Sequence, residues 1–372
     1  MFSPRDRLMV LAPHPDDESL ATAGLLQRAA ARGAATRVVF ATDGDDNPWP
    51  QRVAERRLWI GAAGRERWAA RRRAEGRAAL DALGLPRESA VFLGLPDRGL
   101  TRLLLERPAS VVSELAARVV AWRPTVLAMP SLRDRHPDHN ALAVLTLEAI
   151  ASLPVDERPI VLTYVVHPLD AHFARPGLDV RLDAAERDRK TRAVACHGAQ
   201  LRFHRRAVRD VVATPEHFAV ASAAAAAAIP RAITAASCDH GVLRVRLAGW
   251  LWRWRAATLL VVGRDATGRD ATLRVRLLAG RARTIVHDQA SGAVVGCGYR
   301  TYRDGETIVA VGTPWAPGGV RFFVKLVTHG VFFDREGWIE GSVRGREPDA
   351  VTYPSRLDMR LPARPGALIV TG

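Results

Sequence analysis

The chain of 372 residues is 48% hydrophobic and 25% charged, with a formal net charge of +15. These proportions exclude a disordered or fibrous protein. The length predicts two domains that each bury a core of their own. No apolar run approaches the roughly 18 residues of a membrane-spanning helix, so we expect none.

The positive charge comes almost entirely from arginine, since Lys190 and Lys325 are the only lysines. Basic proteins often bind nucleic acid or anionic surfaces. Here the arginines are scattered along an alanine-rich chain, and the densest run, at 71–73, falls in a predicted helix where a solvated face explains it. We therefore do not expect nucleic-acid binding as the main function. At most, the charge draws an anionic carrier or a membrane surface towards the protein by peripheral contact.

The three cysteines, Cys196, Cys238 and Cys297, are widely spaced and odd in number. This pattern predicts neither a disulfide framework nor a thiolate zinc site. The apolar run at 8–12 is interpreted as a first buried strand and not as a signal peptide. Together these features predict a cytoplasmic protein, whose oligomeric state the sequence does not indicate.

Strand-like and helix-like segments alternate over the first 200 residues. In chain order, we expect a strand at 7–12, a helix at 19–32, a strand at 36–41, a polar loop at 44–65, a helix at 68–83, a strand at 91–95, a helix at 109–122, a strand at 125–129, a helix at 138–152 and a strand at 160–166. The alternation predicts an α/β fold with a Rossmann-like, mostly parallel sheet and helices on both faces. A site is then expected at the carboxyl ends of the strands.

The pattern changes after an alanine run at 221–228. β-rich segments follow at 242–247, 271–278 and 320–328. We therefore predict a catalytic domain over 1–222, an Ala-rich linker over 223–235 and a β-sandwich-like accessory domain over 236–372. Trp250, Trp252 and Trp254 alternate, which favours a packed sheet face over a carbohydrate-stacking platform.

The first chemical motif, PHPDDE, lies where the first strand turns into the first helix. A nucleotide-binding turn would be rich in glycine, whereas the three carboxylates here would repel a phosphate and suit a cation. His14 and Asp17 are three residues apart, so an imidazole and a carboxylate can converge on one ion. Asp16 then remains available as a base.

A second motif, HPDH, follows the predicted strand at 125–129 and contains His136, Asp138 and His139. It falls on the same sheet edge as His14. The two motifs together supply two histidines and one aspartate for a three-ligand site with open positions, as in catalytic zinc centres. Spacing alone also admits Fe²⁺ or another divalent ion, and a non-haem iron oxygenase is the alternative for such a ligand set.

The pair of motifs resembles the PIG-L or LmbE-like family of zinc-dependent N-deacetylases, over roughly residues 5–220. Weaker matches are Thr42–Gly44, Arg72 with Glu75, FLGLPD at 92–97, and Lys190, Ala193, His197 and Gln200. The chain departs from the family at 198–199, where a Ser often precedes the Gln, and at Arg98, where a Gly commonly follows the Asp. These departures concern substrate contacts and not the metal site.

The resemblance implies His14, Asp17 and His139 as ligands of Zn²⁺ and Asp16 as general base. It implies that His136 stabilises the oxyanion, with Asp138 buttressing it. Substrate contacts are assigned to three further residues, Arg72, Asp97 and His197.

The function expected on this basis is removal of the N-acetyl group from an N-acetylglucosamine-type sugar on a carrier or glycoside. The alternatives are an amidase acting on a larger acyl amide or thiol conjugate, and a protein that binds glycans or anionic polymers.

Overall fold

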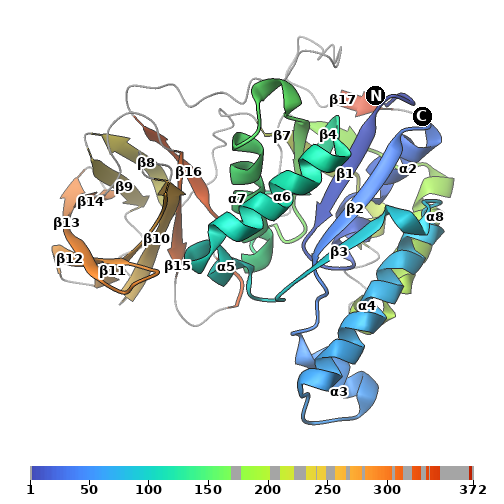
Figure 1. Cartoon of the computed structure of the whole chain (residues 1–372), viewed down its shortest axis with the longest axis horizontal. Coiled ribbons are helices and arrows are strands. Elements are labelled where there is room, and N and C mark those ends of the chain that lie inside the picture. Colours follow the sequence, from blue (N-terminus) through green and yellow to red (C-terminus); the bar gives the residue numbers. More distant parts are fainter. Residues whose placement is uncertain are drawn as a thin grey trace.

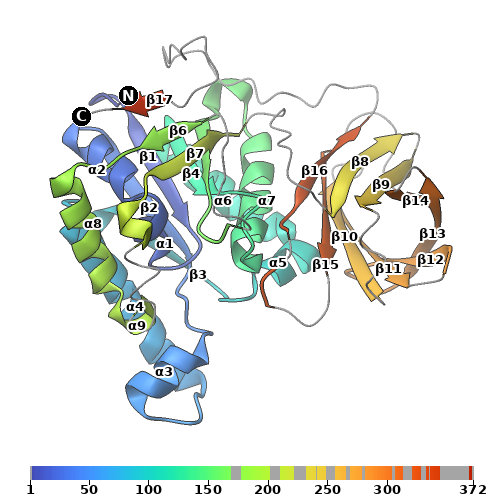
Figure 2. The same cartoon turned by 180° about the vertical axis from the view of Figure 1, so that it is seen from behind.

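The computed structural model (Figures 1 and 2) describes thirteen stretches of the chain: 2–168, 177–201, 210–221, 232–239, 241–248, 256–264, 269–278, 281–303, 306–312, 321–327, 332–334, 336–343 and 368–370. They form an α/β unit and a β barrel that lie side by side. Trp250, Trp252 and Trp254 lie outside the described residues. Within the described residues, no helix combines the length and apolar character needed to cross a membrane.

The α/β unit is built on an eight-stranded sheet in the order β17-β6-β7-β5-β4-β1-β2-β3. The strands are β1 (Arg7–Ala12), β2 (Ala35–Thr42), β3 (Ala90–Leu95), β4 (Val126–Pro130), β5 (Ile160–Tyr164), β6 (Leu178–Val180), β7 (Glu216–Val220) and β17 (Leu368–Val370). The run from β3 to β5 is parallel throughout, and β7 pairs antiparallel with both β5 and β6. The prediction of a mostly parallel sheet is confirmed, and the narrower Rossmann-like assignment stays a prediction.

Helices cover both faces of this sheet. The helices of the unit are α1 (Asp17–Ala21), α2 (Ala23–Ala31), α3 (Pro48–Glu55), α4 (Ala62–Ala82), α5 (Leu100–Glu106), α6 (Pro108–Trp122), α7 (Pro137–Ala151), α8 (Ala184–Cys196) and α9 (Gly198–Leu201), with short 3-10 turns at Arg87–Ser89 and Val155–Glu157. Because successive strand residues point to opposite faces, Met9 and Leu11 pack with α5, α6 and α7, whereas Leu8 and Val10 pack with α2, α4 and α8.

Two predicted elements differ from the structure. The helix expected at 19–32 is divided at Thr22 into α1 and α2. The loop expected at 44–65 contains α3 and the first turn of α4. Pro48 and Pro50 disguise α3, since proline is usually a helix breaker but is tolerated in a first turn, where its missing N–H has no helical partner.

The second unit is a closed barrel of nine strands in the order β10-β11-β12-β13-β14-β9-β8-β16-β15. The strands are β8 (Ile233–Asp239), β9 (Val242–Ala248), β10 (Ala256–Arg264), β11 (Asp270–Leu278), β12 (Arg283–Asp288), β13 (Val294–Arg303), β14 (Glu306–Gly312), β15 (Phe322–Val327) and β16 (Ile339–Val343). All pairs are antiparallel except β16 with β8. The β-rich prediction is confirmed but the sandwich is wrong, because β10–β15 pairing closes the ring and leaves no open edge.

The barrel and the α/β unit share an apolar core. Val262, Phe323 and Trp338 of the barrel side pack in one cluster with the buried face of α6 and α7. Gly337 lies so close to Leu132 that a Cβ there would meet the Leu132 carbonyl oxygen, so a bulkier residue would separate the two units. Helix α7 is thus enclosed between the sheet and the barrel (Figure 1).

Candidate functional site

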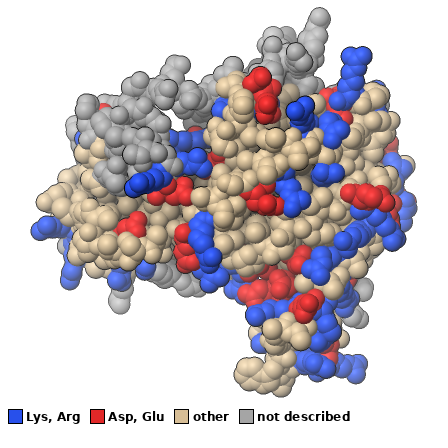
Figure 3. Space-filling view, viewed as in Figure 1, with Lys and Arg blue, Asp and Glu red and all other residues tan. Residues whose placement is uncertain are grey.

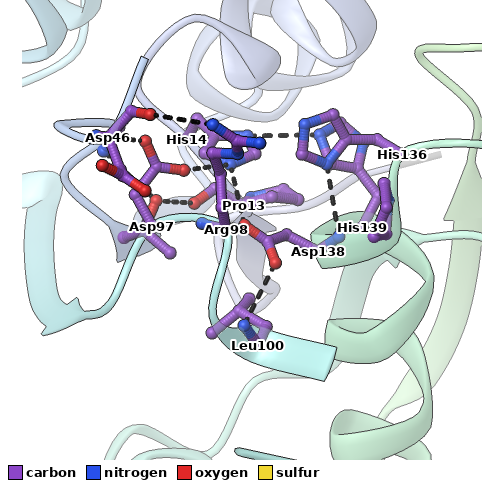
Figure 4. A network of polar contacts seen from close by, with 12 residues as sticks. Pro13, His14, Asp46, Asp97, Arg98, Leu100, His136, Asp138 and His139 are labelled. Carbon is purple, nitrogen blue, oxygen red and sulfur yellow. Dashed lines mark hydrogen bonds and ion pairs between the residues drawn. The ribbon is translucent and has the colours of Figure 1, made fainter. Parts of the chain in front are cut away.

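The two predicted motifs meet at the carboxyl ends of the parallel strands (Figure 4). His14 follows β1, Asp97 follows β3, and His136 is the N-cap residue of α7 after β4. His167 follows β5 and reaches the same cluster, with its ring centroid 5.2 Å from that of His139. Because neighbouring parallel strands end at one edge, residues more than a hundred positions apart lie together here.

Three atoms form a nearly equilateral triangle within this cluster. Asp17 Oδ2 lies 3.2 Å from His14 Nδ1 and 3.2 Å from His139 Nε2, and the two nitrogens are 3.3 Å apart. All three residues are buried. Burial alone would raise the pKa of Asp17, but the imidazoles of His139 and His14 outweigh it and hold the pKa well below its usual value.

The triangle has the dimensions of a tetrahedral zinc site. Bonds of about 2.0–2.1 Å at tetrahedral angles place ligand atoms roughly 3.3 Å apart, which is the separation observed here. Two imidazole nitrogens and a carboxylate are also the donor types that zinc takes in catalytic centres. The residues present therefore fit a divalent metal, and other overlapping groups around His14 and His139 could also hold one.

Each histidine of the triangle is held from behind by a carboxylate. Asp134 Oδ2 lies 3.2 Å from His139 Nδ1 and accepts hydrogen bonds from the backbone N–H groups of Val166 and His167, at 2.7 and 3.1 Å. Such partners fix the tautomer and orientation of metal-binding imidazoles. Asp134 lies two residues before the HPDH motif, and this spacing gave no signal of its supporting role.

Asp97 and Asp138 both face His14 Nε2, at 3.2 and 3.5 Å. Asp97, expected as a substrate contact, is thus placed to orient His14. Asp138 was expected to buttress His136, but its carboxylate instead accepts hydrogen bonds from the backbone of Arg98 and Leu100, at 2.6 and 3.1 Å. The reason is that α7 directs the Asp138 side chain towards the loop after β3 (Figure 4).

Asp16 has a backbone conformation that side chains rarely adopt, with φ 140° and ψ −29°. Its backbone N–H donates to Glu18 Oε2 at 2.9 Å, and its carboxylate lies 3.3 Å from the Arg72 guanidinium. Burial raises the pKa of Asp16 to about 6, against the opposing effect of Arg72. Strained residues of this kind gather at active sites, where the surrounding structure holds them in place.

The strain at Asp16 predicts that Asp16→Gly unfolds at a higher denaturant concentration than Asp16→Ala. Both variants remove the carboxylate, but only glycine adopts a positive φ freely. We expect a difference of about 1–2 kcal/mol in the free energy of unfolding. At Asp188, inside α8, the same pair of substitutions should show the opposite order, by about 1 kcal/mol. Urea denaturation curves of the four variants check this, and equal stability at position 16 would contradict it.

Arg72 and His197, expected as substrate contacts, are almost completely buried, at 2% and 1% exposure. His197 Nε2 lies 2.8 Å from Glu18 Oε1, and Ser19 Oγ donates to the same carboxylate at 2.6 Å. Glu18 in turn binds the backbone of Asp16. Arg72 therefore holds Asp16 directly and His197 holds it through Glu18. In this structure both side chains are too deeply buried to touch a substrate.

His136 belongs to the same cluster, with its ring centroid 4.7 Å from that of His139. Burial, together with the neighbouring histidines, lowers the pKa of His136, so its imidazole is neutral. The Asp138 backbone N–H donates to His136 Nδ1 at 3.2 Å. The proton of the neutral ring then sits on Nε2, which makes that atom a hydrogen-bond donor.

The barrel side contributes residues that the sequence did not indicate. The Phe332 ring lies 5.1 Å from the His136 ring in an edge-to-face arrangement, and Phe333 lies 5.2 Å from His167. The Arg98 guanidinium stacks over Phe332 at 4.8 Å. Arg98 keeps a left-handed φ of 57°, the conformation that favours the glycine expected there from the family resemblance.

A buried polar network joins this aromatic wall to α7. Asn140 Nδ2 donates to Asp334 Oδ2 at 2.7 Å, and Lys325 Nζ donates to Asn140 Oδ1 at 3.1 Å. Lys325 also forms an ion pair with Asp334. The backbone carbonyl of Asp334 accepts from Arg135 Nε at 3.0 Å. Buried polar groups are expensive unless paired, so the network fixes Phe332 and Phe333 relative to the HPDH turn.

Residues 9–150 match the PIG-L family, described as GlcNAc-PI de-N-acetylase. The similarity to the PIG-L family that the two motifs predicted is therefore found over this stretch. The stretch contains the triangle of possible ligands, Asp16 and His136.

One curated relative of the chain is the 1D-myo-inositol 2-acetamido-2-deoxy-alpha-D-glucopyranoside deacetylase of Mycolicibacterium smegmatis. The two are 32% identical over 160 residues, which are 40% of this chain and 54% of the relative. The matched stretch therefore spans about half the length of that relative.

Among solved structures, a conserved protein of Thermus thermophilus is 26% identical with a TM-score of 0.44, covering 60% of this chain and 99% of that one. N,N'-diacetylchitobiose deacetylase of Pyrococcus horikoshii is 18% identical with a TM-score of 0.45, covering 58% and 83%. The 4-carboxy-2-hydroxymuconate hydratase of Pseudomonas putida KT2440 is 20% identical with a TM-score of 0.45, covering 60% and 99%.

Proposed function

We propose that this protein is a metal-dependent N-deacetylase that removes the acetyl group from an N-acetylglucosamine-type sugar on a carrier or glycoside. The observation that carries the proposal is the triangle of His14 Nδ1, Asp17 Oδ2 and His139 Nε2, with separations of 3.2–3.3 Å. The PIG-L match and the curated relative, a deacetylase of a 2-acetamido sugar, support the same reaction and substrate class.

A zinc ion held by these three residues would polarise the amide carbonyl and make water more acidic. Asp16, held beside the ligands by Glu18 and Arg72, is the general base. It accepts a proton as water adds to the carbonyl carbon, and it delivers a proton to the amine as the C–N bond breaks. Acetate and the free amino sugar are the products.

His136 stabilises the negative charge that develops on the carbonyl oxygen. Its neutral ring presents the Nε2 proton to the site, because Nδ1 accepts from the Asp138 backbone. A preorganised donor of this kind typically contributes about 10²–10³ in rate. Phe332 and Phe333, which are exposed beside this ring, would supply an aromatic wall on which the face of a sugar can lie.

We further propose that residues 1–222 are the catalytic domain and that a linker joins them to an accessory domain. The bounds expected for these two parts, 223–235 and 236–372, need correction, because β8 of the barrel begins at Ile233 and β17 (Leu368–Val370) pairs with β6 in the α/β sheet. The aromatic wall gives the accessory domain a task at the site, since Phe332 and Phe333 lie beside His136 and His167. The metal identity is proposed as zinc from the donor set, with Fe²⁺ as the alternative.

The proposal is tested by incubating the purified full chain, loaded with Zn²⁺ or Fe²⁺, with N-acetylglucosaminyl-inositol, N,N'-diacetylchitobiose and N-acetylglucosaminyl lipids. Mass spectrometry follows the loss of one acetyl group, and an enzymatic acetate assay confirms the product. A panel of amides with longer acyl chains tests the amidase alternative. Turnover of the sugars with acetate release is the expected result. The absence of turnover on every N-acetyl sugar by the metal-loaded protein would overturn the proposal.

A further inference from the structure

Residues 47–61, here called the finger, project from the body of the α/β unit (Figures 1 and 2). The finger consists of α3 and the loop that leads to α4. Helix α3 has eight residues, so it is about 12 Å long at 1.5 Å per residue. Arg56, in a left-handed conformation with φ 52°, ends the helix and turns the chain back.

The finger exposes large apolar side chains. Trp49 is 70% exposed, Leu58 83% and Trp59 86%, and Val53 is exposed as well. Trp49 and Val53 are four positions apart and therefore lie on one face of α3. Most large apolar side chains of a folded chain are buried, and a cluster of exposed ones marks a binding surface.

Basic side chains accompany these apolar groups. Between residues 48 and 61 the chain has three arginines, Arg52, Arg56 and Arg57, and a single acid, Glu55. The Glu55 carboxylate accepts a hydrogen bond from Gln51 and forms an ion pair with Arg67, both at 3.0 Å, so its charge is already paired. Arg52 stacks on Trp49 at 5.2 Å. In Figure 3 the projection at the lower edge ends in uncharged surface, with basic and some acidic surface beside it.

The root of the finger is fixed to the body. Gln51 is fully buried and donates to the carbonyl oxygen of Gly64 at 2.6 Å. The Asp46 backbone N–H donates to Asp97, the carboxylate that faces His14. The exposed apolar side chains are therefore carried by an anchored element that begins beside the cluster of possible metal ligands.

We propose that the finger docks this protein on an anionic lipid bilayer. Tryptophan prefers the interface between headgroups and acyl chains, and a cationic, apolar segment binds there by inserting its apolar side chains while arginines contact anionic lipids. The finger presents both features on a narrow projection, and its positive charge matches the negative surface of such a membrane. Dimer formation through the finger is less favoured, because a second copy of the chain would have to enclose a narrow projection, whereas stable dimers usually pair two flat faces.

Docking in this way would bring the possible metal ligands around His14 close to the lipid surface, because the finger starts beside Asp97. A carrier embedded in the membrane would then meet the site without leaving the bilayer. The docking itself does not depend on the proposed deacetylase activity, and Asp16→Asn should bind vesicles as wild type does.

The test is flotation of the full chain with vesicles of phosphatidylcholine, alone or mixed with phosphatidylglycerol. Wild type should float with the mixed vesicles only. Leu58→Ser/Trp59→Ser should lower the partition coefficient at least about tenfold, from lost apolar insertion. Arg56→Gln/Arg57→Gln should lower it roughly fivefold per arginine and reduce its dependence on salt.

The matched control is Ile285→Ser/Val294→Ser, which removes two apolar side chains of the barrel that are 53% and 64% exposed. This variant should float as wild type does. Thermal denaturation verifies that every variant is folded. The proposal is wrong if wild type does not float, if both serine pairs lower binding equally, or if light scattering shows a dimer that the finger variants dissociate.

Discussion

Asp16→Asn should lower kcat for N-deacetylation by about 10²–10⁴-fold, the usual contribution of general acid–base catalysis, with KM little changed. The amide keeps the size and most hydrogen bonds of the carboxylate but cannot accept the proton from water. Because Asp16 is not one of the triangle residues, the bound metal should stay at the wild-type level. Steady-state acetate release and metal analysis of the same preparation measure both quantities.

The control for this variant is Asp188→Asn, which makes the same chemical change at an exposed carboxylate paired with Arg192 on α8. It should retain wild-type kcat. Asp16→Asn with full activity would remove Asp16 from the mechanism. Loss of bound metal in Asp16→Asn would instead show that Asp16 is a ligand.

Substitutions in the triangle and behind it should weaken metal binding in a graded way. His139→Gln removes a ligand and should abolish both stoichiometric zinc binding and activity. Asp134→Asn leaves the ligands in place but alters the partner of His139 Nδ1, 3.2 Å away, and should weaken zinc affinity about 10–100-fold. Competition with a chromophoric chelator measures these affinities.

His217→Gln is the control, because His217 is an exposed histidine on β7 that pairs with Asp179. Its zinc affinity should equal that of wild type. Circular dichroism shows whether His139→Gln and Asp134→Asn remain folded without metal. Unchanged zinc affinity in folded His139→Gln would contradict the assignment of His139 and would point to the overlapping group of His14, Asp97 and Asp138, which does not contain it.

The sequence predicted the central strands and the meeting of the two motifs because both depend on local signals. Buried strands read as short apolar runs, and each motif directly follows one of them, so parallel pairing brings His14 and His139 together. The roles of Arg72 and His197 were not predictable in this way. Both residues pack behind the loop of Asp16 and Glu18 through contacts more than fifty positions apart in the chain.

The aromatic wall of Phe332 and Phe333 could not be predicted from the sequence for a related reason. Phe332 and Phe333 carry no motif, and they reach His136 only because the barrel packs on α7. Closure of the barrel also depends on pairing between β10 and β15, which are separated by more than fifty residues. Alternating apolar residues indicate strands but do not specify which edges meet.

The core that α7 shares with Val262, Phe323 and Trp338 couples the stability of the barrel to that of the candidate metal site. The helix that carries His139 is covered on one side by the sheet and on the other by β10 and β15. Heating should therefore melt the two units in one cooperative transition. A substitution that creates a cavity on the barrel-facing side of α7 should therefore make His139 more mobile, although the substituted residue does not contact His139. In a lineage that kept this activity, the two units would be under selection as a single folding unit.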